Sequence, residues 1–314
     1  MKNLIKNLFL TILFSILLFF VLRYSHIAKE YAYLGLNTWY HQMIPSLLPF
    51  MIISSMLIHL NLDEIIIKPF SPILRMLYQI SNPAIYVMVM GFLCGFPMGA
   101  KTAALEYESG KISKEEAEYL LAFVNNIGPA YYLSFVYGNI IPQKKLLTGL
   151  FLLYGIPLLY GFILRHTFYR NKISICSNSI SLPHRKKEKT TLFFALDTSI
   201  HNGLTQISML GGYMIICNLL VMIPKLLFAH TPILCSLFHN IMEISGGLLS
   251  IRALNLSSIQ TFAYTHICLV FTGISCHLQT FHILHHSHLS CKKYMLHKII
   301  LCSIVCIILY VSIR

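Results

Sequence analysis

The sequence predicts an all-α polytopic membrane protein, built as an inverted repeat with two re-entrant helical hairpins. The first observation is composition: the 314 residues are 56% hydrophobic and 11% charged, with a mean hydropathy of +0.68. So little charge is atypical of a soluble domain of this length. The second observation is that short apolar runs are broken by Gly95-Phe96-Pro97 and by Glu243. Broken membrane helices are typical of transporter folds, where they surround a solute site.

Residues 1–39 are predicted to form a signal-anchor span and a polar connector. Lys2 and Lys6 precede the apolar run 8–22, and no small-x-small cleavage site follows it. The run is therefore expected to be retained as a membrane anchor. Trp39, at the end of the connector, is expected to lie at the membrane interface.

Residues 40–164 are predicted to form the first gate-like repeat, with a hairpin over 82–126. Asn82, followed by proline, is typical of a helix N-cap. The 15 residues from there to Phe96 are too few to cross a bilayer, which takes about 20. Ser113 to Glu116 has the capping-box pattern of a second helix, whose Glu118 is expected to face away from the buried side.

The second repeat is predicted over 195–285, with a hairpin over 237–254. A basic loop over 165–194 separates the two repeats, and a second basic loop with a last span occupies 286–314. Because cytoplasmic loops are rich in Lys and Arg, the N-terminus and the 165–191 segment are expected to be cytoplasmic. The sequence thus predicts a multi-pass protein of the cell membrane, in contact with the lipid bilayer.

Glu243 is the sharpest functional candidate, because an ionisable residue inside an apolar run is costly and usually functional. Ser245 and Gly246 follow it and are expected to expose backbone amides to a cavity. The carboxylate could bind a sugar hydroxyl or a base N–H, or couple to a proton or sodium ion. An ion pair with Arg252 or Lys101 is the structural alternative.

Paired amides at Asn125 and Asn126 form the matching element of the first half, because amides both donate and accept hydrogen bonds. They could bind a polar solute or cap the preceding helix. His277 and Gln279 follow Gly273 in a later span and could face the same cavity. The complete predicted substrate-binding set is Gly95, Pro97, Lys101, Asn125, Asn126, Gly128, Glu243, Ser245, Gly246, His277 and Gln279.

Several functional classes are not expected. The net charge of +13 comes from loop cations, so nucleic-acid binding is not predicted. The nine cysteines contain no CxxC pair, and the histidines at 282, 285, 286 and 288 have no carboxylate or thiol at a ligand spacing. Metals and cofactors are therefore not predicted. Without an HExxH, GxSxG or Walker motif, nothing in the sequence supports an enzyme.

Four motifs carry a resemblance to a known family: GFPMGAK at 95–101, the 106–129 stretch, MEISGG at 242–247 and GISCHLQ at 273–279. Together they resemble the YlbJ family of sporulation integral membrane proteins. That family belongs to the wider set of membrane proteins with a nucleoside-recognition "gate" domain, related to the core of concentrative nucleoside transporters. The resemblance implies a role in endospore formation, in spore-envelope or cortex assembly, and a transporter-like fold.

Two hypotheses follow. In the first, the chain moves an unidentified small polar solute, with or without a coupling ion, around Glu243 and Asn125-Asn126. In the second, it is a structural or assembly protein that does not transport, and its charged first hairpin docks other sporulation membrane proteins. The cavity distinguishes them, since a transporter should have Glu243 facing a wet cavity shared with Asn126.

Overall fold

The computed structural model describes residues 2–60, 62, 65, 67–141, 145–173, 191–227 and 230–313. Over these residues the chain is helical, with an isolated bridge between Tyr137 and Ile141 and no strand. This part of the chain has four helical stretches long and apolar enough to cross a membrane, or six if each of two bent helix pairs is one span. The predicted all-α polytopic class is confirmed.

The N-terminal helices depart from prediction. α1 (Lys2–Arg23) is followed by α2 (Ser25–Thr38), which continues through a π-helical turn (Trp39–Met43) into α3 (Ile44–His59). The residues of the predicted polar connector are therefore mostly helical. Trp39 donates its indole N–H to the carbonyl of Ile207, 2.7 Å away, and its ring packs on Gly211. The tryptophan therefore packs the α2–α3 helix against α12 (Leu192–Leu227). The predicted position at the membrane interface did not include this contact.

The first half contains α5 (Ser71–Tyr78), α6 (Asn82–Cys94), α7 (Met98–Glu108), α8 (Lys114–Leu121) and α9 (Pro129–Tyr131), which continues as a π-helical turn (Tyr132–Val136). Ser81, not Asn82, is the N-cap of α6, and its side chain accepts from Ala84 N. Ser113 caps α8 by accepting from Glu116 N. The Glu116 carboxylate accepts from Ser81 N instead of completing the capping box, so it joins α8 to the start of α6.

The next span consists of α10 (Leu146–Leu150), a π-helical turn (Phe151–Gly155) and α11 (Ile156–His166). Most of the predicted basic loop, 174–190, lies outside the described residues. Arg165, counted in that loop, is buried and donates to the carbonyls of Gln79, Tyr169, Arg170 and Ile173. This arginine therefore joins the C-terminal end of α5 to the segment that follows α11.

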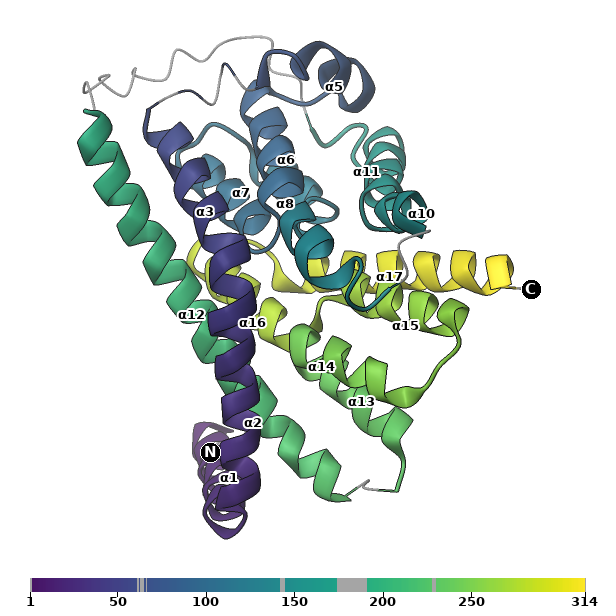
Figure 1. Ribbon diagram of the computed structural model, residues 1–314. Helices are drawn as coiled ribbons and strands as arrows, with labels where there is room; N and C mark the ends of the chain where they lie inside the picture. Colours follow the sequence, from purple (N-terminus) through teal and green to yellow (C-terminus); the bar gives the residue numbers. More distant parts are fainter. Residues whose placement is uncertain are drawn as a thin grey trace.

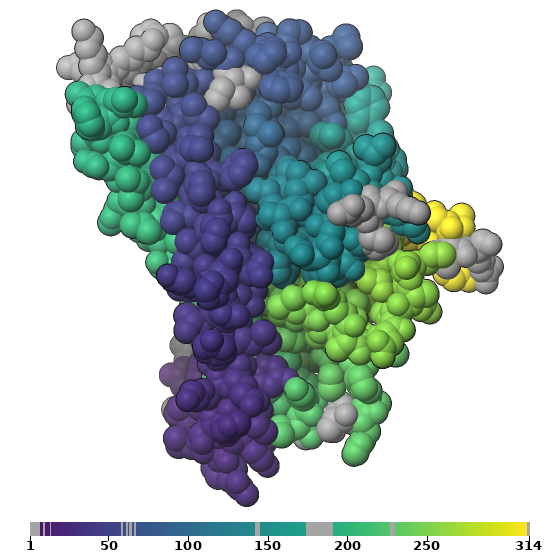
Figure 2. All heavy atoms as spheres, in the orientation of Figure 1, coloured from purple at the N-terminus to yellow at the C-terminus, as the bar shows by residue number. Residues whose placement is uncertain are grey.

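The second half contains α12, α13 (Pro232–Met242), α14 (Ile244–Ile251), α15 (Ser258–Phe271), α16 (Gly273–His286) and α17 (Cys291–Ile313). In Figure 1, α12 lies beside α2–α3 along the length of the molecule, while α17 extends sideways from the centre. Figure 2 shows the teal part of the first half above the yellow-green part of the second half, while the green α12 reaches up the left side beside the first half.

Both halves have the same order of elements. A helix pair folds back at a break, α6–α7 at 95–97 and α13–α14 at Glu243, and an interrupted helix follows, α8–α9 and α15–α16. In each half the two breaks touch: a Cβ at Gly95 would collide with the backbone of Gly128, and one at Gly273 would lie 3.2 Å from Ile244 N. This shared order agrees with a repeat, whereas the inversion of the second copy stays a prediction.

A polar clamp joins the first hairpin to the loop between α16 and α17. The Glu118 carboxylate accepts from Lys293 Nζ at 2.6 Å and from Ser290 N at 3.3 Å. Glu108 accepts from the hydroxyl of Ser287. The Glu118 side chain is 4% exposed, so the prediction that it faces away from the protein is wrong.

Glu118→Ala should lower the free energy of unfolding by about 1–3 kcal/mol, because it leaves the backbone donor and Lys293 without their buried acceptor. Glu115→Ala is the matched control, since Glu115 is exposed on the same helix and should change stability by about 0.5 kcal/mol or less. Denaturant unfolding in detergent micelles measures both. Equal stability of the two variants would contradict a stabilising clamp.

Candidate functional site

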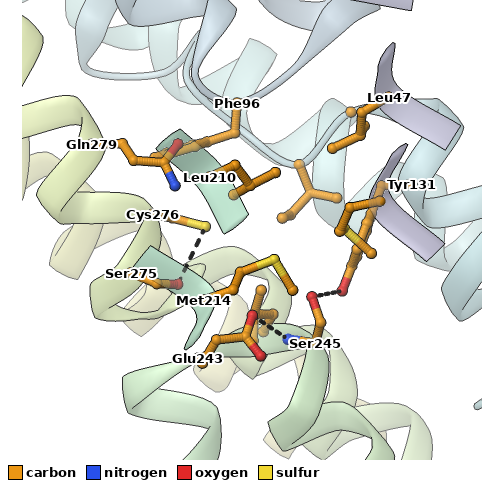
Figure 3. A pocket seen from close by; sticks show the side chains of 14 residues that line it. Leu47, Phe96, Tyr131, Leu210, Met214, Glu243, Ser245, Ser275, Cys276 and Gln279 are labelled. Carbon is orange, nitrogen blue, oxygen red and sulfur yellow. Dashed lines mark hydrogen bonds between the residues drawn. The ribbon is translucent and has the colours of Figure 1, made fainter. Parts of the chain in front are cut away.

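The helix breaks at Phe96, at Ile127-Gly128 and at Glu243 line a small cavity at the centre of the molecule. The first turn of α16, which follows the break between α15 and α16, lines it too. The volume of the cavity is about 40 Å³. The lining residues come from both halves and from α3 and α12: Met43, Leu47, Phe96, Ile127, Gly128, Tyr131, Leu210, Met214, Glu243, Ile244, Ser245, Ser275, Cys276 and Gln279. Figure 3 shows the polar groups of the second half, such as Glu243 and Ser275, across the cavity from apolar side chains that include Leu47 and Phe96. A buried water needs about 10–15 Å³ of such space, so the cavity has room for no more than a few waters in this conformation.

Glu243 is the N-cap of α14. Its Oε1 accepts from Ser245 N at 2.9 Å, and its Oε2 accepts from Gly246 N at 2.7 Å. A carboxylate at a helix N-terminus is stabilised by the free amides and by the helix dipole. The side chain is 1% exposed and has no ion pair with any cation in the described part of the chain. The alternative pairing with Arg252 or Lys101 is therefore wrong.

Two aromatic residues of the first half, Phe96 and Tyr131, also line the cavity. The Tyr131 hydroxyl donates to Ser245 Oγ at 3.2 Å, so it links the α9 segment to the second break (Figure 3). Sequence reasoning did not select either residue. Phe96 stood in the predicted break itself, whereas no local pattern distinguishes Tyr131 from its neighbour Tyr132.

Asn125 and Asn126 belong to a separate buried network. Asn125 accepts from Ala100 N and donates to Thr280 Oγ1 and to the Tyr294 hydroxyl. Tyr294 in turn bonds His277 Nδ1 at 3.1 Å. The Asn126 amide donates to the Phe123 carbonyl. The asparagine side chains are thus engaged by protein groups at the end of α8.

Lys298 completes this network and was missed. Its ammonium donates to Asn125 O at 2.9 Å and to Asn126 Oδ1 at 3.3 Å, and the residue is 3% exposed. Over the part of the chain that the structure describes, no carboxylate pairs with it. α17 starts at Cys291, well before Lys298. The lysine therefore lies about two turns inside the helix instead of in the loop before it.

A curated relative resembles the chain over nearly its whole length. The chain is 24% identical to the sporulation integral membrane protein YlbJ of Bacillus subtilis strain 168, over an alignment covering 94% of this chain and 80% of that protein. This similarity supports the resemblance to the YlbJ family. This kinship supports a role as a sporulation membrane protein. No protein-family model matches the sequence, and no solved structure matches the chain.

The structure divides the predicted binding residues into two groups. Gly128, Glu243, Ser245 and Gln279 line the cavity, and the Gln279 amide Nε2 has no hydrogen-bond partner among the described residues. The other predicted residues, Gly95, Pro97, Lys101, Asn125, Asn126, Gly246 and His277, do not line it. The cavity and the Lys298 network flank α16, whose Cys276 and Gln279 face the cavity while His277 and Thr280 face the Lys298 network.

Possible metal ligands are not gathered anywhere in the described ranges, where no group of three or more His, Cys, Asp or Glu could hold an ion. The histidines at 282, 285 and 286 lie on the last turns of α16, and His288 follows in the loop. The candidate site of the chain is therefore the Glu243 cavity, flanked by the Lys298 network.

Proposed function

We propose that the chain is a transporter-like protein of the developing spore, which moves a small polar solute across its membrane and is not an enzyme. The observation that carries this proposal is the cavity where broken helices of both halves meet, with a buried carboxylate in its wall. Non-helical backbone at membrane depth is tolerated where it borders a solute cavity, and intramembrane carboxylates are usually functional. The resemblance to gate-domain proteins supports the same proposal.

Each half would move as a unit around the fixed site. Tyr131 and Ser245 supply a single hydrogen bond between the halves at the cavity, which can be exchanged for bonds to a solute. Glu243 would accept hydrogen bonds from the solute or hold the coupling ion, and the Gln279 amide would donate. The N-terminus and the 165–191 segment would lie on the cytoplasmic side, as the loop charges indicate.

A second candidate is a structural protein of spore assembly that does not transport. The engagement of Asn125 and Asn126 by protein groups favours it, as does a cavity too small for a nucleoside. In that case the charged surface of the first hairpin would dock other sporulation membrane proteins.

Glu243→Gln distinguishes the two candidates. Gln keeps the shape but cannot carry the charge, so under the transport proposal spores of this variant should lack the same solutes as spores of a deletion strain. Mass spectrometry of spore contents measures this, with Glu115→Gln on the exposed face of α8 as the matched control. Full sporulation by Glu243→Gln at normal protein levels, with a defective deletion strain, would favour the structural candidate.

A further inference from the structure

Two side chains that do not line the cavity form a hydrogen-bonded chain to Glu243, in which Asn218 contacts the carboxylate and His239 contacts Asn218. Asn218 on α12 donates from Nδ2 to Glu243 Oε2 over 3.2 Å. Asn218 Oδ1 lies 2.7 Å from Nε2 of His239, which is on α13. No member of this triad is more than 5% exposed. The sequence offered one signal, an asparagine in the middle of the apolar run of α12.

The donor directions in the triad are fixed by counting protons. Asn218 Nδ2 also donates to Met214 O at 2.8 Å, so both amide protons are used. Asn218 Oδ1 can only accept, and His239 must therefore carry a proton on Nε2. His239 thus holds the amide in the orientation that aims Nδ2 at Glu243.

The Glu243 carboxylate consequently receives three N–H donors, from Ser245 N, Gly246 N and Asn218 Nδ2. A carboxylate has about four acceptor positions, two on each oxygen. Oε2 accepts from two of these donors and Oε1 from one, so the remaining position is on Oε1, near the Ser245 hydroxyl. Donors to the charged form favour ionisation, against the cost of burial.

Two glycines pack closely against the triad. A Cβ at Gly246 would lie 2.5 Å from Asn218 Oδ1 and 2.6 Å from His239 Nε2. From α2, a Cβ at Gly35 would lie 3.2 Å from Asn218 Nδ2. The absence of side chains at these two glycines makes room for the Asn218–His239 bond.

We propose that Asn218 and His239 are positioning residues that keep Glu243 ionised and leave one position of its Oε1 free for the solute or its coupling ion. This inference rests on the proposed function of the Glu243 cavity, which it deepens. The other titratable groups close to the triad are Tyr31 of α2, Tyr131 of α9, Cys217 and Lys225 of α12, and Cys276 of α16. All of them stay unchanged in the variants below.

The test is the reactivity of Glu243 with dicyclohexylcarbodiimide, which modifies protonated carboxyl groups in apolar surroundings and spares carboxylates. The full chain in detergent is treated at one neutral pH, and peptide mapping by mass spectrometry gives the rate at Glu243. Asn218→Asp keeps the size of the side chain but replaces the donor with an acid. Asn218→Leu removes the donor, and either change should raise the rate about tenfold, since a hydrogen bond to a charged group is lost.

His239 gives a graded comparison. His239→Leu should raise the rate less than the Asn218 variants do, whereas His239→Gln should stay near the wild-type rate because its amide can donate to Asn218 Oδ1. Asn202→Leu is the control on the same helix, since the Asn202 side chain contacts His59 and not Glu243.

A wild-type rate for Asn218→Asp, in protein with wild-type unfolding behaviour, would overturn the proposal. Should Asn218→Leu fail to fold, the near-isosteric Asp variant decides alone. The readout concerns the carboxyl group itself, so it is independent of solute movement. A raised rate together with normal spore solutes in Glu243→Gln would keep the positioning role and reject the transport proposal.

Discussion

Gly95→Ala should prevent the chain from accumulating as a folded membrane protein. Gly95 has φ +71°, and a Cβ there would collide with the backbone N and Cα of Gly128. The ψ of Gly95 is −154°, a backbone conformation that essentially only glycine adopts and that costs another residue about 1–3 kcal/mol. The collision is with backbone, which cannot rotate away, and overpacking of this kind adds about 1–3 kcal/mol or more. Together these costs are a large part of a typical stability of about 5–15 kcal/mol.

Gly110→Ala is the comparison at a positive φ without a collision. Gly110 has φ +72°, almost the same as Gly95, but nothing lies within 4 Å of a Cβ at this position. Its substitution should cost only the conformational term of about 1–2 kcal/mol. Membrane yield and thermal unfolding in detergent measure both variants. Equal behaviour of Gly95→Ala and Gly110→Ala would mean that the two breaks of the first half do not touch.

The breaks at Gly95-Phe96-Pro97 and Glu243 were predictable because they are local. A proline beside a glycine, or an acid inside an apolar run, interrupts a membrane helix whatever surrounds it. The same reasoning identified Glu243, Ser245 and Gln279, which line the cavity. Helix ends were less predictable: α17 starts at Cys291 because Lys292 and Lys293 are tolerated in its first turn, although they resemble loop residues.

The partners of each polar residue could not be predicted, because they come from distant parts of the chain. Asn125 and Lys298 are 173 positions apart, and Glu118 and Lys293 are 175 apart. Charge patterns predict which loops face the cytoplasm. They do not distinguish a loop lysine that sets the topology from a lysine that is buried in the protein. Lys298 is the clearest example, since it was counted with the loop cations and is buried.

Lys298→Gln should leave the protein folded and abolish its contribution to sporulation. The Gln amide can still donate a hydrogen bond toward Asn125 O or Asn126 Oδ1, so little stability should be lost. The charge, however, would be gone. Lys292→Gln is the matched control, because Lys292 is exposed on the first turn of the same helix. Spore yield from a deletion strain carrying each variant, normalised to protein level, is the measurement.

The reason to expect a functional loss is energetic. A buried ammonium without a carboxylate costs several kcal/mol even after relaxation, and its two carbonyl acceptors could be satisfied equally well by a neutral donor. A purely structural bond between α17 and the end of α8 would not require a cation. The charge is therefore expected to act when the halves move, as Asn125 and Asn126 exchange partners. If Lys298→Gln restores spore yield as fully as the wild-type gene does, the ammonium is only a hydrogen-bond donor and the network is structural.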